Sequence, residues 1–131
     1  MYQIEKTDFG VKLAFSGFMQ KEEMEKWVKE SEAVLRSLPG KFSVLIDMRQ
    51  LKPLPKDAEA EMQKGQKLYK EKGMQRSAVI LSSSLTTMQF RRIAKETGIY
   101  DWERYFDAST EPNWEASSID WLARSIDPDK K

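Results

Sequence analysis

The first seventeen residues contain two stretches in which apolar and polar side chains alternate. These stretches are Tyr2–Lys6 and Val11–Ser16, and a turn that ends at Gly10 separates them. Alternation with a period of two is typical of a strand with one buried face. Two such strands around a short turn predict an antiparallel hairpin, with Leu13 and Phe15 on its buried face.

The period changes to that of a helix between Gln20 and Leu38. Side chains of the predicted buried stripe recur at spacings of three and four residues, which places them on one face of a helix. Pro39 and Gly40 are expected to end this helix. The stripe consists of Met24, Trp27, Val28, Ser31, Val34, Leu35 and Leu38.

Short apolar runs and helical stretches alternate through the rest of the chain. Continuous apolar runs are typical of strands that are covered on both faces. In the second helix Gly65 is costly, so we expect a close approach to the sheet at this position. The predicted strands are Phe42–Asp47, Ser77–Leu81 and Glu103–Phe106. Three further helices are predicted: one is capped by Asp57 and ends near Gly73, one follows Ser82–Ser84 and ends at Thr97, and the last covers Pro112–Ile126.

This order of elements predicts an α/β sandwich. A hairpin followed by alternating helices and strands gives a mixed, mostly parallel sheet of about five strands with about four helices. The 131 residues suit one domain, which we place over residues 1–126, and residues 127–131 are expected to form a loose tail.

The composition removes several classes of chemistry. The chain has no Cys and no His, which excludes a disulfide, a thiolate nucleophile, a Ser-His-Asp triad and a zinc site built on Cys or His. We therefore expect no cofactor and no metal. The formal net charge of +1 is far from the basic excess of a nucleic-acid-binding protein.

The apolar runs are also too short for a membrane protein. The longest, Val44–Ile46 and Ala78–Leu81, fall far below the roughly 20 residues of a spanning helix, so no stable membrane insertion is expected. The start of the chain lacks the long apolar segment of a secretory signal. A cytoplasmic location is the resulting expectation.

Candidate binding residues follow two buried strands, because open α/β sheets bind ligands at the carboxyl ends of their strands. After the strand that ends at Asp47 come Met48, Arg49, Leu51 and Leu54. Asp47 could hold a cation, but a carboxylate that fixes loop amides is the favoured interpretation. Arg49 could grip an anion, although an ion pair or a solvated side chain is more common.

The start of the third helix supplies the other candidates. Ser83 could help to bind an anion, but helix capping is the favoured role. Leu85 and Met88 lie outside the core face of this helix on a helical wheel, on the side that points towards water. Together with Leu51 and Leu54 they could form a contact patch. The alternative is that neighbouring loops cover them.

The tryptophans leave a further choice open. Trp102, Trp114 and Trp121 could line a hydrophobic cavity or a dimer interface, although packing in the core is the commoner use. A homodimer through the hairpin edge or through the last helix is therefore possible.

The order of elements and two short motifs resemble the STAS superfamily, the sulphate-transporter and anti-sigma-factor-antagonist domains. One motif is Val44-Leu45-Ile46-Asp47-Met48-Arg49. The other combines Arg104-Tyr105-Phe106-Asp107 with Ile119-Asp120-Trp121-Leu122, and it is similar to the end of the SpoIIAA-like branch. The resemblance implies a SpoIIAA-like fold and a non-catalytic domain that binds a partner protein.

The resemblance also implies a regulatory site that this chain alters. Anti-sigma-factor antagonists are switched by phosphorylation of a Ser in an Asp-Ser-Ser-Gly motif at the start of the second helix. The corresponding residues here are Pro55-Lys56-Asp57-Ala58, which carry no hydroxyl. Asp57 could act as a fixed negative cap, but phosphoregulation at this position is not expected.

Two functions remain in view at this stage. The first is a binding or regulatory module that presents a surface to a protein partner, with candidate residues Met48, Arg49, Leu51, Leu54, Asp57, Ser83, Leu85 and Met88. The alternative is a carrier of an apolar or lipid-like small molecule, because SpoIIAA-like domains are similar in shape to CRAL-TRIO lipid-transfer domains. An enzyme is the least favoured class, since acid–base work would have to proceed without His.

Overall fold

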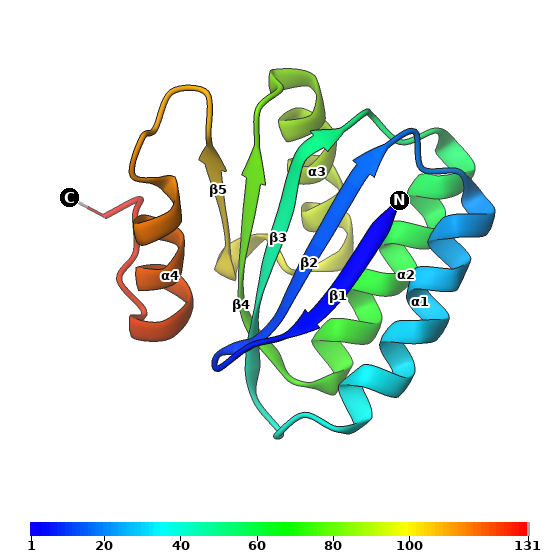
Figure 1. Cartoon of the computed structure of the whole chain (residues 1–131), viewed down its shortest axis with the longest axis horizontal. Coiled ribbons are helices and arrows are strands. Elements are labelled where there is room, and N and C mark those ends of the chain that lie inside the picture. The colour runs from blue at the N-terminus through cyan, green and yellow to red at the C-terminus, as the bar shows by residue number, and fades with distance from the viewer. Residues whose placement is uncertain (131) are drawn as a thin grey trace.

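The computed structural model describes residues 1–130, which form one five-stranded sheet with the strand order β1-β2-β3-β4-β5. β1 runs antiparallel to β2, and the remaining neighbours are parallel, so β2 to β5 all point towards the upper edge of the sheet in Figure 1. The strands are β1 (Tyr2–Lys6), β2 (Gly10–Gly17), β3 (Phe42–Leu51), β4 (Met74–Leu81) and β5 (Glu103–Asp107).

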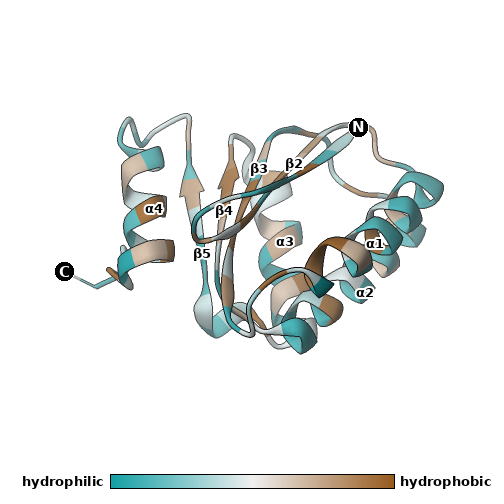
Figure 2. Ribbon diagram, turned by 60° about the horizontal axis from the view of Figure 1, so that its bottom comes forward, coloured by the Kyte–Doolittle hydropathy of each residue, from teal (hydrophilic) through white to brown (hydrophobic). Residues whose placement is uncertain are grey.

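The helices cover the two faces of the sheet unequally. Three helices, α1 (Lys21–Arg36), α2 (Lys56–Lys72) and α3 (Ser84–Thr97), lie on one face, and α4 (Trp114–Arg124) packs against β3, β4 and β5 on the other (Figure 2). A short 3-10 helix, η1 (Tyr100–Trp102), leads into β5. The predicted α/β architecture with an opening hairpin is thus confirmed.

The larger core lies between the sheet and α1–α3, with Trp27 at its centre. The ring of Trp27 contacts Phe15 edge to face, with centroids 5.1 Å apart, and stacks on Tyr69 at 5.7 Å. A smaller core lies beneath α4, where Trp121 and Leu122 cover apolar side chains of the sheet that include Ile80. Each core therefore has a tryptophan from a covering helix.

Gly65 allows a close approach, but to a different neighbour from the one expected. A Cβ atom at this position would lie 2.1 Å from Cζ3 of Trp27, which belongs to α1 and not to the sheet. α1 and α2 pack side by side, and the missing side chain leaves room for the indole. The predicted helix end is confirmed, since Gly73 follows α2 in the left-handed conformation.

Several element boundaries differ from the sequence-based expectation. β3 continues beyond Asp47 to Leu51, because β2 pairs with it as far as the Gly17–Leu51 pair. The N-cap of α2 is Pro55, so Asp57 lies inside the first turn and is not the cap. The last helix begins at Trp114 and ends at Arg124, two residues inside each predicted boundary.

The expected loose tail begins at Asp127, yet this residue is fixed to the sheet. Nε and a terminal nitrogen of Arg104 donate to its two carboxylate oxygens at 2.8 and 2.9 Å, and both side chains are 14% exposed. The first residue of the predicted tail is thus tied to β5 by an ion pair. Lys131, the last residue of the predicted tail, lies outside the described residues.

Residues 1–130 lack two features that would point to particular functions. No helix in this range has the length and hydropathy needed to cross a bilayer. Within the same range no three Asp or Glu side chains lie close enough together to hold a metal ion.

Candidate functional site at the carboxyl edge of the sheet

The carboxyl ends of β2 to β5 form one edge of the sheet, at the top of Figure 1. Among the described residues five large apolar side chains are strongly exposed, and four of them lie along this edge. They are Met1, Phe18, Leu85 and Met88, whereas Ile126 lies after α4. The edge is therefore the place where apolar surface meets water.

The exposure of Leu85 and Met88 agrees with the prediction from the helical wheel. They are 69% and 67% exposed, and the neighbouring loops do not cover them. The opposite face of α3 is buried, as its spacing predicts. That face consists of Thr86, Phe90, Ile93, Ala94 and Thr97.

Phe18 belongs to the same edge, and the sequence analysis missed it. It is 75% exposed and directly follows β2. β2 ends further along the sheet than β4, because Gly17 pairs with Leu51 whereas Ile80 of β4 pairs with Asp47. Phe18 and the start of α3 therefore follow different strands at the same edge of the sheet. The alternation in β2 did contain a signal for this exposure. Its buried side chains are at the odd-numbered positions 11, 13 and 15, whereas Phe18 is at an even-numbered position.

Three of the predicted contact residues are instead buried. Met48, Leu51 and Leu54 are 3%, 4% and 6% exposed, so they cannot form an accessible patch with Leu85 and Met88. Met48 and Leu51 belong to the extended β3, and the loop that contains Leu54 folds onto α3. Gln89 fixes this loop, because its side chain accepts from the Leu54 amide at 2.9 Å and donates to the Leu54 carbonyl at 2.8 Å.

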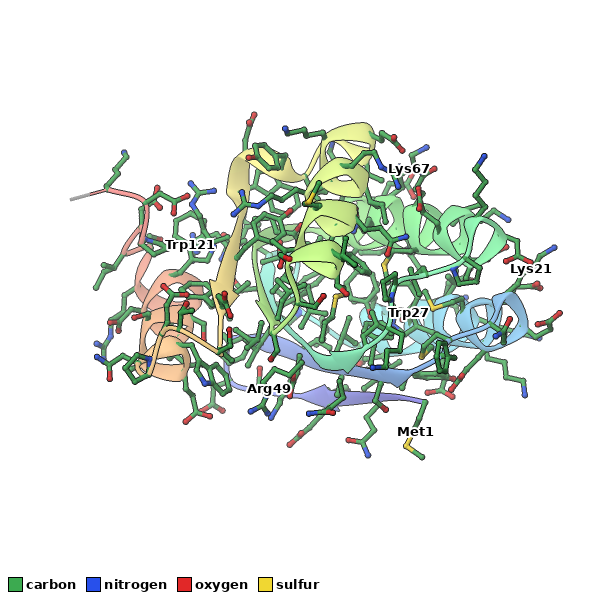
Figure 3. The ribbon with its side chains drawn as sticks, turned by 90° about the horizontal axis from the view of Figure 1, so that it is seen from above. Met1, Lys21, Trp27, Arg49, Lys67 and Trp121 are labelled. Atoms are coloured by element: carbon green, nitrogen blue, oxygen red, sulfur yellow. The ribbon has the colours of Figure 1, made fainter. Side chains whose placement is uncertain are left out.

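Asp47 and Arg49 form a closed ion pair on the α4 side of the sheet. Arg49 donates from Nε and a terminal nitrogen to the two carboxylate oxygens at 3.0 and 2.9 Å. Its guanidinium also lies 4.6 Å from the ring centroid of Trp114. Figure 3 shows Arg49 and Trp27 on opposite sides of the strands. The ion-pair interpretation of Arg49 is thus confirmed.

The electrostatics of Asp47 follow from this pair. Burial alone would raise the pKa of its carboxyl, but the hydrogen bonds from Arg49 outweigh burial and bring the pKa below its ordinary value. Both oxygens already accept from Arg49, and one also accepts from the Arg49 amide at 3.1 Å. The pair therefore stiffens β3, which disfavours the cation-binding interpretation.

Ser83 acts as the N-cap of α3. Its hydroxyl oxygen accepts from the Thr86 amide at 3.4 Å, and its carbonyl accepts from the Thr87 amide at 3.0 Å. The capping interpretation is confirmed, and it explains why α3 starts here and points Leu85 outwards.

A hollow of about 460 Å³ opens beside Met88, between α3 and the segment that follows β5. Arg91 and Tyr105 are among its lining residues, with the guanidinium carbon of Arg91 4.5 Å from the centroid of the tyrosine ring. Asp107 and Glu111 also line it. The hollow is thus lined by groups of both charges together with the exposed Met88 of α3.

The cavity between the sheet and α1–α3 is small, with a volume of about 20 Å³. Its lining includes Trp27, Met48, Met62, Tyr69 and Glu103. A space of this size admits about one water molecule, whereas small-molecule sites usually measure several hundred Å³.

The other tryptophans serve mainly in packing. Trp121 is buried, and its indole nitrogen donates to the carbonyl of Ser77 at 3.0 Å. Trp102 and Trp114 are partly buried against the cores. None of these three side chains lines the internal cavity.

Glu103 is a second residue that the sequence analysis missed. It is 3% exposed, and its carboxylate accepts from the hydroxyls of Ser77 at 2.9 Å and Tyr105 at 2.6 Å. Burial raises its pKa to about 7, against the opposing effect of the two hydrogen bonds. The alternation of β5 did indicate the direction of this side chain. Glu103 and Tyr105 are two residues apart in the strand, so both face the same side of the sheet.

The comparisons with known proteins bear on the fold. No family model and no curated protein matches the chain. A solved structure does: an uncharacterised protein of the DUF3478 family with a SpoIIAA-like fold, from Shewanella loihica PV-4. The two are 25% identical with a TM-score of 0.64, over 94% of this chain and 93% of the other. The chain has a SpoIIAA-like fold.

The SpoIIAA-like fold confirms the resemblance inferred from the sequence and gives the start of α2 its context. The residues there are Pro55-Lys56-Asp57-Ala58, as expected without a hydroxyl. Asp57 is exposed, and its carboxylate accepts from the Ala58 amide at 2.8 Å. A negative charge in the first turn stabilises a helix, so a structural role suffices to explain this residue.

Proposed function

We propose that this SpoIIAA-like protein is a non-catalytic binding module that presents its carboxyl edge to a protein partner. The contact surface consists of Phe18, Leu85 and Met88. The observation that carries the proposal is that four of the five strongly exposed large apolar side chains in residues 1–130 lie along this edge. Natural monomers rarely leave apolar surface exposed together unless it meets a partner.

The charges around the contact surface favour a protein over a membrane. Lys52, Lys56 and Asp57 are exposed on the neighbouring loop and helix start, and Asp107 and Glu111 lie beyond Met88. A membrane-binding surface would be dominated by Lys and Arg. An apolar centre within a rim of both charges is instead the usual anatomy of a protein–protein contact.

The polar groups near this edge support a binding role over catalysis. Asp47 is held by Arg49, and Asp107 accepts from the amide of Ser109 at 2.9 Å. These carboxyls have pKa values below their ordinary ones, so they are poor proton donors and acceptors near neutral pH. The alternative of a carrier is disfavoured by the size of the internal cavity.

The proposal is tested by affinity capture followed by titration of the purified partner. The double variant Leu85→Ala/Met88→Ala and the single variant Phe18→Ala should each weaken binding at least about tenfold, because contact centres concentrate the binding energy. Ile126→Ala is the matched control, since it removes an exposed apolar side chain away from the edge. Equal binding by all variants, with circular dichroism unchanged, would contradict the proposal.

A further inference from the structure

Glu103 is an ionisable group that is almost fully buried, with 3% of its surface exposed. It begins β5 and lines the apolar cavity between the sheet and α1–α3. Its only direct polar partners in the described residues are the hydroxyls of Ser77 and Tyr105. Removing a carboxylate from water without a cationic partner is costly, so the protonated form is favoured.

The surrounding elements offer no compensating charge. Within residues 1–130 no Lys or Arg lies within ion-pair distance of Glu103, and Tyr69 of α2 is the only other titratable group on the cavity wall. The charged groups nearest in the fold are engaged elsewhere. Arg91 of α3 lies on the ring of Tyr105, Lys95 lies on the ring of Tyr100, and Arg104 binds Asp127.

Tyr105 connects this buried carboxyl to the outside. Its hydroxyl donates to Glu103 at 2.6 Å and lies 3.4 Å from the carbonyl of Phe90 in α3. The ring of the same tyrosine forms a wall of the hollow beside Met88, under Arg91. One side chain therefore contacts both the buried carboxyl and the hollow.

We propose that Glu103 is a proton-controlled switch that changes the hollow beside Met88 through Tyr105. This inference deepens the proposed function, because it supplies a means of regulating the same contact surface. The switch needs no phosphorylatable hydroxyl at the start of α2.

The physical basis is the change of hydrogen bonding when Glu103 loses its proton. The neutral carboxyl shares its bonds with two hydroxyls, each of which can donate or accept. The ionised carboxylate only accepts, and it binds hydroxyl donors more strongly. The ionised Glu103 therefore draws the Tyr105 hydroxyl towards itself and away from the carbonyl of Phe90. The cavity also has room for one water molecule, which would hydrate the new charge. The pKa of about 7 places this change near neutral pH.

The test follows the methyl group of Met88 by NMR while the pH rises from about 5.5 to about 8.5. In the unmodified protein the Met88 signal should shift with a midpoint near 7. Glu103→Gln keeps the size and polarity of the side chain but cannot titrate, so its Met88 signal should stay constant. Glu61→Gln is the matched control, because Glu61 is also buried but is bonded to Lys64 at 2.9 Å, and its Met88 shift should persist.

A second variant separates the buried titration from its transmission. In Tyr105→Phe the carboxyl carbon of Glu103 should still titrate, whereas the Met88 signal should no longer follow it. A constant Met88 signal in the unmodified protein overturns the switch, as does an unchanged Met88 shift in Glu103→Gln. Simultaneous loss of all native signals on raising the pH also overturns it, because that outcome is global unfolding.

This measurement needs no binding partner. A failed capture experiment would therefore remove the contact surface from the proposed function while leaving the switch intact. Conversely, a flat Met88 titration with successful capture would remove only the switch.

Discussion

The two faces of the sheet are held to their helices by different interactions. On the α1–α3 face, Trp27 lies among apolar and aromatic side chains and fits into the space left by Gly65. On the α4 face, Trp121 is held by polar contacts: its indole donates to Ser77, and the guanidinium of Arg104 lies 4.5 Å from its ring centroid. Shape complementarity thus fixes the larger layer, and directional bonds fix the smaller one. Substitutions should therefore be more costly on the first face.

Trp27→Ala should produce the largest loss. It removes an indole that is 2% exposed and contacts both Phe15 and Tyr69, so the free energy of unfolding should fall by about 4 kcal/mol. Urea denaturation measures this change. Phe18→Ala removes an aromatic ring that is exposed, and it should change stability by less than about 0.5 kcal/mol. Similar losses in both variants would contradict the assignment of Trp27 to the centre of the core.

The one buried carboxyl on the cavity wall of this face, Glu103, should make stability depend on pH. Its pKa is raised from 4.5 to about 7 in the folded protein, so the folded state binds more protons than the unfolded state between these values. Stability should therefore fall as the pH rises through this window, by about 3 kcal/mol in total.

In Glu103→Gln the free energy of unfolding should no longer fall across this pH window, and denaturation at a series of pH values measures that free energy.

The opposite trend is expected in acid. There Asp47, Glu59 and Asp127, whose pKa values are lowered by their partners, lose their bonds on protonation, so stability should decline again as the pH falls below about 4. A stability that rises from pH 5 to 8 would contradict the buried site.

Gly65→Ala tests the fit between α1 and α2. Alanine favours a helix by about 1 kcal/mol over glycine, but here its Cβ would collide with the ring of Trp27. The collision should dominate and lower the free energy of unfolding by about 2 kcal/mol. Gly40→Ala is the control, because a Cβ there meets nothing within 4 Å, and its stability should stay nearly constant. A stabilised Gly65→Ala protein would show that the helices separate easily.

Trp121→Phe should have the smallest effect of the four. It retains an aromatic ring beneath α4 but removes the hydrogen bond from the indole to the Ser77 carbonyl, at a cost of about 1 kcal/mol. Trp114→Phe removes no such bond to the sheet and serves as the control. Thermal denaturation compares the two, and an equal effect would show that the hydrogen bond adds nothing to the docking of α4.

Much of the fold could be predicted because local periodicity encodes it. The alternation in β2 and the three-and-four spacing of α1 each indicate one kind of element, and the short, β-branched apolar run of β4 favours a strand. Leu85 and Met88 were predictable for the same reason, since the phase of α3 alone turns them towards water. The extent of β3 was not predictable, because its last residues are strand only by pairing with β2.

The candidate site was predicted only in part. Leu51 and Leu54 resemble exposed loop residues in the sequence. Leu51 is instead the last residue of β3, and Gln89, a residue distant in the chain, fixes the loop that contains Leu54 onto α3. Glu103 resembles an ordinary surface charge until the sheet and α3 enclose it. The parity of β5 indicates which face of the sheet Glu103 belongs to, but its burial depends on which distant elements cover that face.

The amino-acid sequence by itself determined the order and kind of the elements, the outward phase of Leu85 and Met88, and the absence of thiol and imidazole chemistry. These properties depend on neighbouring residues or on residue type alone. The tertiary structure decided that Phe18 joins the same edge, that Gly65 accommodates Trp27, and that Glu103 lies in an apolar interior next to Tyr105. Each of these depends on segments brought together across the chain, where exclusion of water changes what a side chain can do.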